Sequence, residues 1–463
     1  MALKRPPGPK GVPVLGSVPE FNRERLNFLL NNARQYGDIV YYKLLNYHIY
    51  QLNHPDYIQE VLVNEAEQVN KGDLDKAVLS PTVGNGILTS EGEFHRSQRK
   101  LMQPAFHHKR IEAYGQVMTD YTARLLNTWR DGQMVDIHEA MTTLTMQIVS
   151  KSLYDADVND ESDAIGEAVH TINQIGGQQF QQGFVPPKWL PIAQNRDAKH
   201  AIQQLDALMM PIIEERRKSG EDKGDLLSML LLAQDEVSGS GMTDRQVRDE
   251  AVTLFVAGHE TTSNLLSWAW HLLAQHPKAE AKLHEEVNGV LGGVAPTLSD
   301  LARLPYTDWV IKEALRLNPP AWILNGRKPL TDLQIGGYTI PKGSLIFLSP
   351  YVMHRDPRYF DNPSAFIPER WADGLEKRIP RYAYFPFGGG PRVCIGNQFA
   401  LMEAKLVLAT IAGRYSLSLA SSKAVELDPL VTLRPKDGIA MRLSARQVLP
   451  VQTVKAPTTA VHF

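Results

Sequence analysis

A single cysteine constrains this chain more than any other residue. Cys394 is the only cysteine among 463 residues, and it lies in the segment FGGGPRVCIGNQFA. A lone free cysteine is most often a small buried hydrophobic group. Here, however, Gly388, Gly389 and Gly390 precede the thiol, and glycine lets a backbone adopt positive φ and approach a flat group closely. We therefore expect a tight loop that presents the sulfur to a ligand.

The residues after the thiol predict a helix whose start lies near the sulfur. Gly396 should give the turn similar freedom, and an apolar-periodic helix begins near Asn397. The positive end of a helix dipole favours a thiolate over a thiol. A thiolate can bind haem iron and favour cleavage of dioxygen over its reversible storage. The loop and helix together therefore indicate oxidation chemistry.

The spacing of residues around the thiol resembles that of a known family. Phe387, Gly390, Arg392 and Gly396 stand at fixed offsets from Cys394. The pattern F-x-x-G-x-R-x-C-x-G resembles the haem-ligand loop of the cytochrome P-450 family. This resemblance implies that the cofactor is haem b and that Cys394 is the ligand of its iron. The other cofactor contacts that it implies in the loop are Phe387, Gly388, Arg392 and Gly396.

A second motif, AGHETT at residues 257–262, lies in the middle of a long helical pattern. Thr243 and Gln246 have the spacing of a capping box at the start of the pattern, and Pro277 marks its end. A helix of roughly 33 residues is about 50 Å long, which is enough to cross a whole domain. The motif resembles the oxygen-binding segment of the family, so this helix is expected to line the haem.

The resemblance gives the AGHETT motif a catalytic role. Glu260 and Thr261 place an acid beside an alcohol, the pair that relays protons to bound oxygen. The alternative for Thr261 is an ordinary hydroxyl bonded to the preceding turn. Gly258 costs about 1 kcal/mol in a helix interior, and close approach of the backbone to the macrocycle would explain its presence. The cofactor contacts implied here are Ala257 and Gly258.

A structural ion-pair network is also implied. Glu313 and Arg316 are three residues apart in a short helical stretch, residues 307–317, which two prolines close. Such a pair is normally a solvated surface contact worth a few tenths of a kcal/mol. The E-x-x-R pattern, however, resembles the core ion pair of the family, and FIPERW at residues 366–371 resembles the segment whose arginine, Arg370, joins it. We expect these three side chains to form one buried network that holds the cysteine loop in register.

The two propionates of haem and the thiolate require compensating cations. His95 and Arg99 are four residues apart and share a helical face, and they resemble the W/H-x-x-x-R pattern of the family. Arg392 and Arg327 complete the expected clamp, although Lys328 could replace Arg327. Taken alone, His95 would more often be a surface residue than a ligand partner.

Length and composition agree with a large globular protein. The chain is 43% hydrophobic and 22% charged, and its length alone suggests about three domains. The motifs between residues 95 and 396 must nevertheless meet at one cofactor. We therefore expect residues 1–463 to form a single cytochrome P-450 haem domain. Residues 1–20 are proline-rich and should form an extended N-terminal segment.

The pattern between the motifs is mainly helical. The resemblance implies a mainly α fold with small β-sheets, with haem between the long central helix and the helix of the cysteine loop. Residues 171–191 are rich in glutamine, glycine and proline, and they should form either a mobile lid over the substrate entrance or a plain surface loop. Helices are predicted at residues 110–131, 163–174, 197–219 and 279–291, and strands at residues 39–52 and 333–348.

Charge and hydropathy exclude several other classes. Net charge is only −2, which does not indicate nucleic-acid binding, and one cysteine excludes an intramolecular disulfide. Basic residues and prolines precede any apolar run at the N-terminus, and no apolar stretch approaches the roughly 20 residues that span a bilayer. We expect a soluble, cytoplasmic monomer without a membrane span.

The substrate walls are assigned by family position alone. An apolar pocket favours a lipophilic substrate such as a fatty acid or a terpenoid, but the same residues could simply be core. The residues expected to form these walls are Val78, Leu79, Phe255, Val256, Trp322, Ile323, Leu324, Leu430 and Val431.

The resemblance implies a monooxygenase that inserts one atom of O₂ into its substrate by hydroxylation or epoxidation. The chain has no G-x-G-x-x-G unit and no cysteine set for a cluster, so NAD(P)H should act only through a ferredoxin or flavodoxin-type donor and its reductase. The donor would dock on Lys377, Arg378 and Arg381, unless these are merely solvated surface.

Three other classes of function are alternatives to the monooxygenase. A haem-thiolate peroxygenase or isomerase would need no reductase, and a non-catalytic haem sensor would not oxidise its ligand. A metallohydrolase requires the pattern H-E-x-x-H, but Ser263 stands where the second histidine would be.

Overall fold

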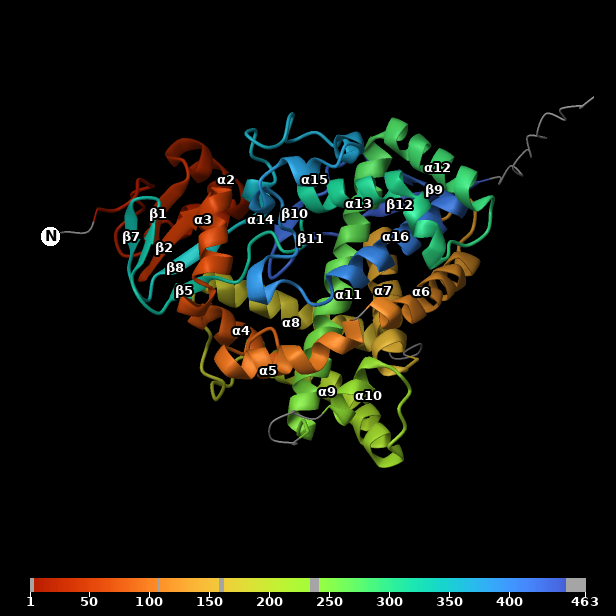
Figure 1. Cartoon of the computed structure of the whole chain (residues 1–463), viewed down its shortest axis with the longest axis horizontal. Coiled ribbons are helices and arrows are strands. Elements are labelled where there is room, and N and C mark those ends of the chain that lie inside the picture. Colours follow the sequence, from red (N-terminus) through yellow and green to blue (C-terminus); the bar gives the residue numbers. More distant parts are fainter. Residues whose placement is uncertain (1–3, 107, 158–161, 234–240, 447–463) are drawn as a thin grey trace, which may run out of the picture.

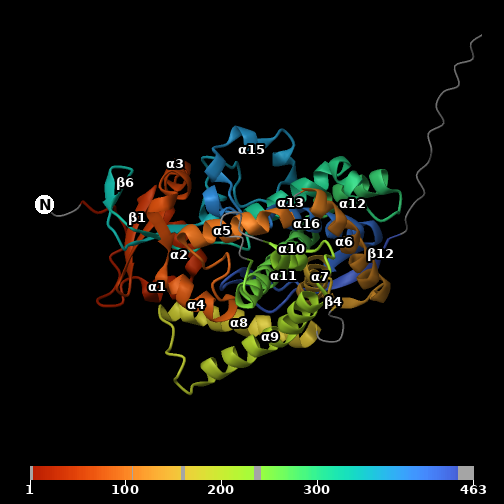
Figure 2. The same ribbon diagram turned by 60° about the horizontal axis from the view of Figure 1, so that its bottom comes forward.

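A computed structural model describes residues 4–106, 108–157, 162–233 and 241–446, and Figure 1 shows its arrangement. Helices fill most of the molecule, and the largest sheet lies at the end that carries the N-terminal residues (Figures 1 and 2). The helices are α1 Val18–Arg23, α2 Arg25–Tyr36, α3 Pro55–Gln59, α4 Asp73–Val83, α5 Gly92–Met102, α6 His108–Thr128, α7 Ile137–Tyr154, α8 Ser162–Gln182, α9 Ala193–Ser219, α10 Leu226–Leu232, α11 Asp244–Gln275, α12 Pro277–Leu291, α13 Pro305–Leu317, α14 Pro350–Met353, α15 Leu375–Arg378 and α16 Asn397–Arg414.

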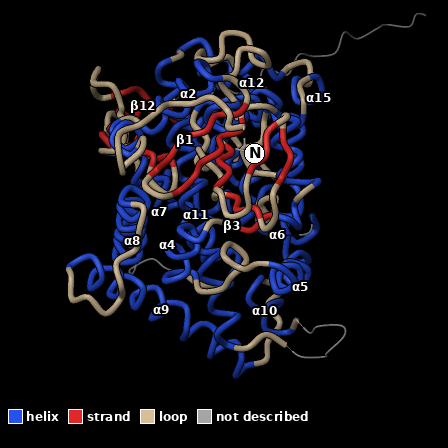
Figure 3. Tube along the Cα trace, turned by 90° about the vertical axis from the view of Figure 1, so that its left-hand side faces the viewer, coloured by secondary structure: helices blue, strands red, loops and turns tan. Residues whose placement is uncertain are grey.

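The strands form one five-stranded sheet and three smaller ones (Figure 3). The large sheet has the order β1-β2-β8-β5-β3, in which only β2 and β8 run parallel. The smaller sheets are β4-β12-β9, β6-β7 and β10-β11. The strands are β1 Ile39–Leu44, β2 Tyr47–Leu52, β3 Val69–Lys71, β4 Met134–Asp136, β5 Arg327–Pro329, β6 Leu333–Ile335, β7 Tyr338–Ile340, β8 Leu345–Leu348, β9 Tyr415–Leu419, β10 Leu427–Pro429, β11 Leu433–Pro435 and β12 Ala440–Ala445.

Helix α11 crosses the centre of the molecule (Figure 1). It has 32 residues and begins at the expected capping box, in which Thr243 accepts from the backbone N–H of Gln246 and Gln246 accepts from that of Thr243. It ends just before Pro277, where α12 begins. Trp268 and Trp270 are almost fully buried on it. The predicted long helix is confirmed.

Helix α8 is longer than the sequence indicated. A helix was expected at residues 163–174 and a lid or loop at 171–191, yet α8 continues to Gln182 and leaves only residues 183–192 as a loop. A Cβ on Gly177 would lie 2.5 Å from the side chain of Leu430, and one on Gly176 would lie 3.1 Å from that of Val431. The glycines therefore let the helix pack closely against the β10–β11 connection, and this tertiary packing outweighs their low helix propensity.

The other expected elements are found with shifted ends. Helices α6, α9 and α12 cover most of residues 110–131, 197–219 and 279–291. Residues 39–52 form the β1–β2 hairpin, and residues 333–348 form β6, β7 and β8. The N-terminal segment is extended only in part, because α1 begins at Val18.

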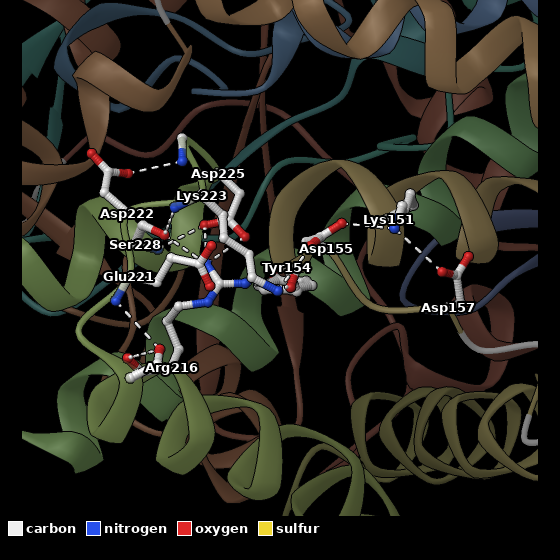
Figure 4. Close-up of polar contacts among 12 residues, drawn as sticks. Lys151, Tyr154, Asp155, Asp157, Arg216, Glu221, Asp222, Lys223, Asp225 and Ser228 are labelled. Carbon is white, nitrogen blue, oxygen red and sulfur yellow. Dashed lines mark hydrogen bonds and ion pairs between the residues drawn. The ribbon is translucent and has the colours of Figure 1, made fainter.

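A buried ion pair joins α9 to α10 and to the end of α7 (Figure 4). Arg216 donates to both carboxylate oxygens of Asp225 at 2.7 Å and to the hydroxyl of Ser228 at 2.6 Å. A second guanidinium nitrogen lies 3.3 Å from the carbonyl of Tyr154. Only 5% of each charged side chain is exposed. Asp225 also caps α10 by accepting from the N–H of Ser228.

Asp225→Ala should destabilise the protein by roughly 3 to 5 kcal/mol, because it leaves the Arg216 charge buried without its partner. Urea unfolding followed by circular dichroism measures the change. Lys436→Ala, which breaks an exposed pair with Glu426, is the matched control and should leave the midpoint unchanged. Equal midpoints for wild type and Asp225→Ala would contradict this role.

Candidate active site

One cavity brings most of the sequence motifs together. Its volume is about 390 Å³, and its walls come from segments as distant as Lys71 and Thr432. Cys394 lines this cavity, and its side chain is accessible from it although protein encloses the site. The sulfur is therefore not packed among hydrocarbon side chains, which was the alternative for a lone cysteine.

The glycines before Cys394 have different structural reasons. Gly388 and Gly390 have φ of 72° and 64°, which favour glycine. A Cβ on Gly390 would lie 1.8 Å from the carbonyl oxygen of Leu62. Gly389 is extended, but a Cβ there would lie 2.3 Å from the ring of Tyr382. The backbone of this loop can therefore pack closely on its neighbours only with glycine at these positions.

Gly396 does not need the freedom expected for it. Its φ is −90°, and it is the N-cap of α16. Burial raises the pKa of the Cys394 thiol, while the backbone N–H of Gly396 and the charge of Arg99 lower it by less. The protein alone therefore favours the thiol, contrary to the expectation from the helix dipole. A coordinated metal ion would reverse this preference, because a coordinating thiol loses its proton.

Glu260 and Thr261 both line the cavity, but they do not bond to each other. The hydroxyl of Thr261 donates to the carbonyl of Ala257 at 2.8 Å. This is the bond to the preceding turn that was the alternative to a catalytic role for Thr261. The carboxylate of Glu260 accepts from Thr432 at 2.6 Å and from Asn173 at 2.5 Å. Burial raises the pKa of Glu260, against the opposing effect of these two donors. Glu260 can therefore hold a proton beside the cavity.

Gly258 also lines the cavity, but its nearest constraint is another helix. A Cβ on Gly258 would lie 3.1 Å from a methyl group of Val149 on α7. Close packing of α11 against α7 is thus a sufficient reason for this glycine, without the close approach to the macrocycle that would also explain it. Ala257 lines the same cavity.

Five basic residues line the cavity near the cysteine loop, and we call them the basic cluster. They are Lys71, His95, Arg99, Arg327 and Arg392.

Lys328, the alternative to Arg327, is not part of the basic cluster. Its ammonium group lies 2.5 Å from the carboxylate of Asp73. The structure thus brings Arg327 rather than Lys328 to the cavity.

Lys71 is the member of the basic cluster that sequence reasoning missed. It ends the three-residue strand β3, where it pairs with Arg327 of β5. Its ammonium group donates to the carbonyls of Ile87 and Ser90 at 3.3 and 3.2 Å. Burial, helped by the charge of Arg392, lowers its pKa to about 7. The strand is too short for a periodic signal, so only the pairing with β5 shows where Lys71 lies.

The basic cluster fits a dianionic cofactor such as haem. Burial and the charges of Arg392 and Lys71 lower the pKa of His95 to about 3, so the histidine is neutral and not the cation expected. Glu91 pairs with Arg392 and is 3.8 Å from Lys76. More positive than negative charge therefore surrounds the cavity beside the thiol, and two propionates would balance it.

Two acids at the start of α11 hold the loop of residues 84–91 over the cavity. Asp249 accepts from the N–H of Asn85 at 2.9 Å, and Glu250 accepts from that of Ile87 at 2.8 Å. Ile87 lines the cavity. Burial, together with the charge of Asp249, raises the pKa of Glu250 to about 7.

The structure also brings Glu313, Arg316 and Arg370 together. Glu313 accepts from the guanidinium of Arg316 at 2.8 and 2.9 Å and from that of Arg370 at 2.9 Å. Glu313 and Arg316 are fully buried. Arg316 donates to the carbonyl of His354 at 2.8 Å, and the His354 ring accepts from the N–H of Phe385 at 3.0 Å. The network therefore reaches the start of the cysteine loop.

The residues expected to line the substrate pocket divide into three groups. Trp322 and Leu430 line a smaller neighbouring cavity of about 130 Å³ instead, and the Trp322 indole donates to the Leu430 carbonyl at 3.1 Å. Phe255 is fully buried, and its ring lies 5.2 Å from that of His259. These three residues therefore do not line the main cavity, contrary to the expectation. The others line it: Val78, Leu79, Val256, Ile323, Leu324 and Val431.

The part of the chain that the structure describes shows neither a further metal site nor a membrane-spanning helix. That part contains no group of three or more His, Cys, Asp or Glu side chains placed to hold a metal ion. None of its helices combines the length and the apolar character needed to cross a bilayer.

An accessible thiol beside a basic, glycine-lined loop is the arrangement of haem-thiolate proteins. The family model described as Cytochrome P-450 matches residues 6–441. The chain therefore belongs to the cytochrome P-450 family.

Two of the most similar relatives are bacterial proteins with a named activity. The chain is 39% identical to cyclooctatin synthase of Streptomyces melanosporofaciens, over 88% of this chain and 89% of that protein. It is 33% identical to pentalenene oxygenase of Streptomyces avermitilis, over 95% and 97%. Among solved structures, retinoic acid-bound cyanobacterial CYP120A1 has a TM-score of 0.85 and 27% identity, and the match covers 96% of this chain and all of the other.

These matches establish the class of reaction. The chain is an oxidoreductase, a cytochrome P-450 monooxygenase that acts on lipophilic small molecules with haem and O₂. Members of the family typically receive electrons from a redox partner.

Glu250→Gln should remove part of the pH dependence of stability. The folded pKa of Glu250 is about 7, above the value of about 4.3 in an unfolded chain. The folded state therefore holds an extra proton between these values, and stability falls as the pH rises through this range. Glutamine keeps an oxygen that can accept from Ile87 but does not titrate.

Urea midpoints at about pH 5 and about pH 8 test this prediction. Between the two, wild type should lose more stability than Glu250→Gln, by on the order of 3 kcal/mol at most. Glu285→Gln, on an exposed face of α12, should behave like wild type. Identical pH dependence in wild type and Glu250→Gln would show that the carboxyl does not titrate as described.

Proposed function

We propose that this monooxygenase oxidises a terpenoid, with one oxygen atom of O₂ entering the substrate and the other leaving as water. The observation that carries the proposal is the single cavity that joins Cys394 to Glu260 and Thr261 through largely apolar walls. The names of two relatives, cyclooctatin synthase and pentalenene oxygenase, support the substrate class.

In this proposal Cys394 binds the iron of haem b, which supplies the activation of dioxygen when it is bound. The basic cluster binds the propionates, with His95 acting as a neutral hydrogen-bond donor. Arg392 and Arg327 provide guanidinium groups, which suit carboxylates because they present several N–H donors in one plane. The Glu313 network supports the loop from behind through His354 and Phe385.

Glu260 and Thr261 move protons in this proposal. Burial favours the protonated form of Glu260, so the acid can hold one proton at its carboxyl and later release it toward the cavity. Thr261 would first have to turn its hydroxyl away from the carbonyl of Ala257. That rotation is available, because threonine in a helix divides between two side-chain rotamers.

The apolar walls orient the substrate and exclude water. Val78, Leu79, Val256, Ile323 and Val431 approach the cavity from several segments of the chain. Each buries hydrocarbon surface against a lipophilic ligand, worth about 25 cal/mol per Å². Such walls favour a terpenoid over a charged or strongly polar compound.

A separate ferredoxin or flavodoxin-type protein, reduced by NAD(P)H through its reductase, is the electron donor in this proposal. Lys377, Arg378 and Arg381 are exposed and could bind an acidic partner. Tyr382, which follows Arg381, packs against the cysteine loop, since a Cβ on Gly389 of that loop would lie 2.3 Å from the Tyr382 ring. This contact places the basic residues beside the cysteine loop and so supports them as the docking site of the donor.

Thr261→Ala should uncouple NADPH consumption from product formation. Without the hydroxyl, this side chain no longer directs protons toward the cavity, and product per NADPH should fall about 10-fold or more while peroxide rises. Ser267→Ala removes a similar hydroxyl bond on α11, to the carbonyl of Ser263 at 2.6 Å, and is the control. Unchanged coupling in Thr261→Ala would remove this role, and turnover with hydrogen peroxide but not with NADPH and a donor would favour a peroxygenase.

A further inference from the structure

The main cavity contains a polar group that neither the thiol nor the basic cluster accounts for. Asn173 of α8, Glu260 of α11 and Thr432, which directly precedes β11, all line it, and we call them the polar trio. Their neighbours on the same wall are apolar, including Ile172, Val256 and Val431. The trio is thus a small polar patch beside these apolar side chains.

Thr432 is bonded on two sides within the protein. It donates to the carboxylate of Glu260 at 2.6 Å and accepts from the side-chain amide of Asn264 at 3.1 Å. Glu260 in turn accepts at both of its oxygens, from Thr432 and from Asn173. These bonds fix the positions of Thr432 and Glu260 within the protein.

Asn173 differs from Thr432 and Glu260 because its bond to Glu260 uses only part of its hydrogen-bonding capacity. A side-chain amide offers two N–H donors and a carbonyl oxygen, and one N–H is given to Glu260 at 2.5 Å. Asn173 as a whole is only 6% exposed. Gly176, one turn further along α8, brings the helix close to Val431 and Val78. The remaining polar atoms of Asn173 therefore belong to a confined, mostly apolar space.

Such a group discriminates between ligands. An amide that stays buried beside a hydrocarbon lacks a partner and is costly, whereas an oxygen atom on the ligand supplies one. Pockets with few polar groups use them to orient ligands. Sites that bind a ligand hydroxyl in this way also disfavour the analogue that lacks it.

We propose that Asn173 hydrogen-bonds an oxygen atom of the substrate, so that the preferred substrate is an already oxygenated terpenoid, an alcohol or a ketone, and not a hydrocarbon. This inference rests on the proposed function, because it names the substrate class of that same cavity. The contact orients the substrate, and Asn173 is therefore a specificity-determining residue.

Binding to the oxidised holoprotein tests the inference without turnover, so that proton transfer by Glu260 does not enter. The probes are two matched pairs, limonene with perillyl alcohol and farnesene with farnesol. The shift of the Soret band on titration gives each dissociation constant. Wild type should bind each alcohol about 3 to 10 times more tightly than its hydrocarbon, which is the worth of one neutral hydrogen bond.

Asn173→Leu should abolish this preference by weakening the alcohols and not the hydrocarbons. Thr432→Val is the matched control, because it also removes one donor to Glu260 but leaves Asn173 in place; it should keep the preference. Asn173→Ala is a second variant for the case that leucine prevents folding, and the Soret band of the oxidised protein shows that each variant holds haem.

Three results would overturn the inference. Equal binding of alcohol and hydrocarbon by wild type contradicts it directly. Equal loss of the preference in Asn173→Leu and Thr432→Val would assign the effect to Glu260. Binding of none of the four probes contradicts the terpenoid proposal itself, and with it this inference, whereas binding without preference leaves the proposed function intact.

Discussion

The accessibility of the Cys394 sulfur from an interior cavity is the feature on which the rest of the site depends. A free thiol normally packs among apolar side chains, and here burial does favour its neutral form. What keeps the sulfur open to the cavity is the course of the backbone before it. Gly389 and Gly390 approach Tyr382 and Leu62 too closely for any side chain, so this loop cannot relax into ordinary packing without losing its contacts.

The loop is also held from behind. Arg316 connects Glu313 to the carbonyl of His354, and His354 accepts from Phe385 at the start of the loop. A buried ion pair of this kind contributes little net stability compared with apolar packing, but removing one partner is costly. The Glu313–Arg316 pair instead fixes positions, because it connects the end of α13 to the segment that presents the thiol.

Charge gives the cavity two distinct sides. The basic cluster surrounds the side near the cysteine loop, and burial, together with mutual repulsion, lowers the pKa of Lys71 and of His95. The polar trio lies among apolar side chains, and there burial favours protonated Glu260. One side therefore suits a dianionic flat cofactor, and the other suits a lipophilic ligand with a single polar atom. The two demands are met by different segments of the chain.

Local signals in the sequence were enough for the parts of this site that one segment builds. The capping box of Thr243 and Gln246 and the spacing of Glu313 and Arg316 depend on neighbours in sequence. The glycines before Cys394 were also found from the local pattern, although Gly390 packs against the distant Leu62. The predictions that failed concern residues whose structure depends on contacts with distant segments of the chain. Gly176 and Gly177 appeared to break a helix, but packing on the β10–β11 connection keeps α8 intact.

Other misses have the same origin. Lys71 lacks a periodic signal, and its pairing with Arg327 is a contact between residues far apart in sequence. Phe255 and Trp322 are apolar and close in sequence to residues that line the cavity. Periodicity alone, however, cannot tell whether an apolar side chain faces the cavity or the core. The bonds of Glu260 to Asn173 and Thr432 also join residues far apart in sequence, so no local pattern signals them.

The most direct test of this account is the absorption spectrum of the reduced protein under carbon monoxide. Sulfur of Cys394 bound to haem iron predicts the long-wavelength Soret band of a thiolate-ligated haem in wild type. Cys394→Ser should lose that band, while Ser267→Ala on α11 should keep it. Retention of the band by Cys394→Ser, or its absence from haem-loaded wild type, would contradict the account at its foundation.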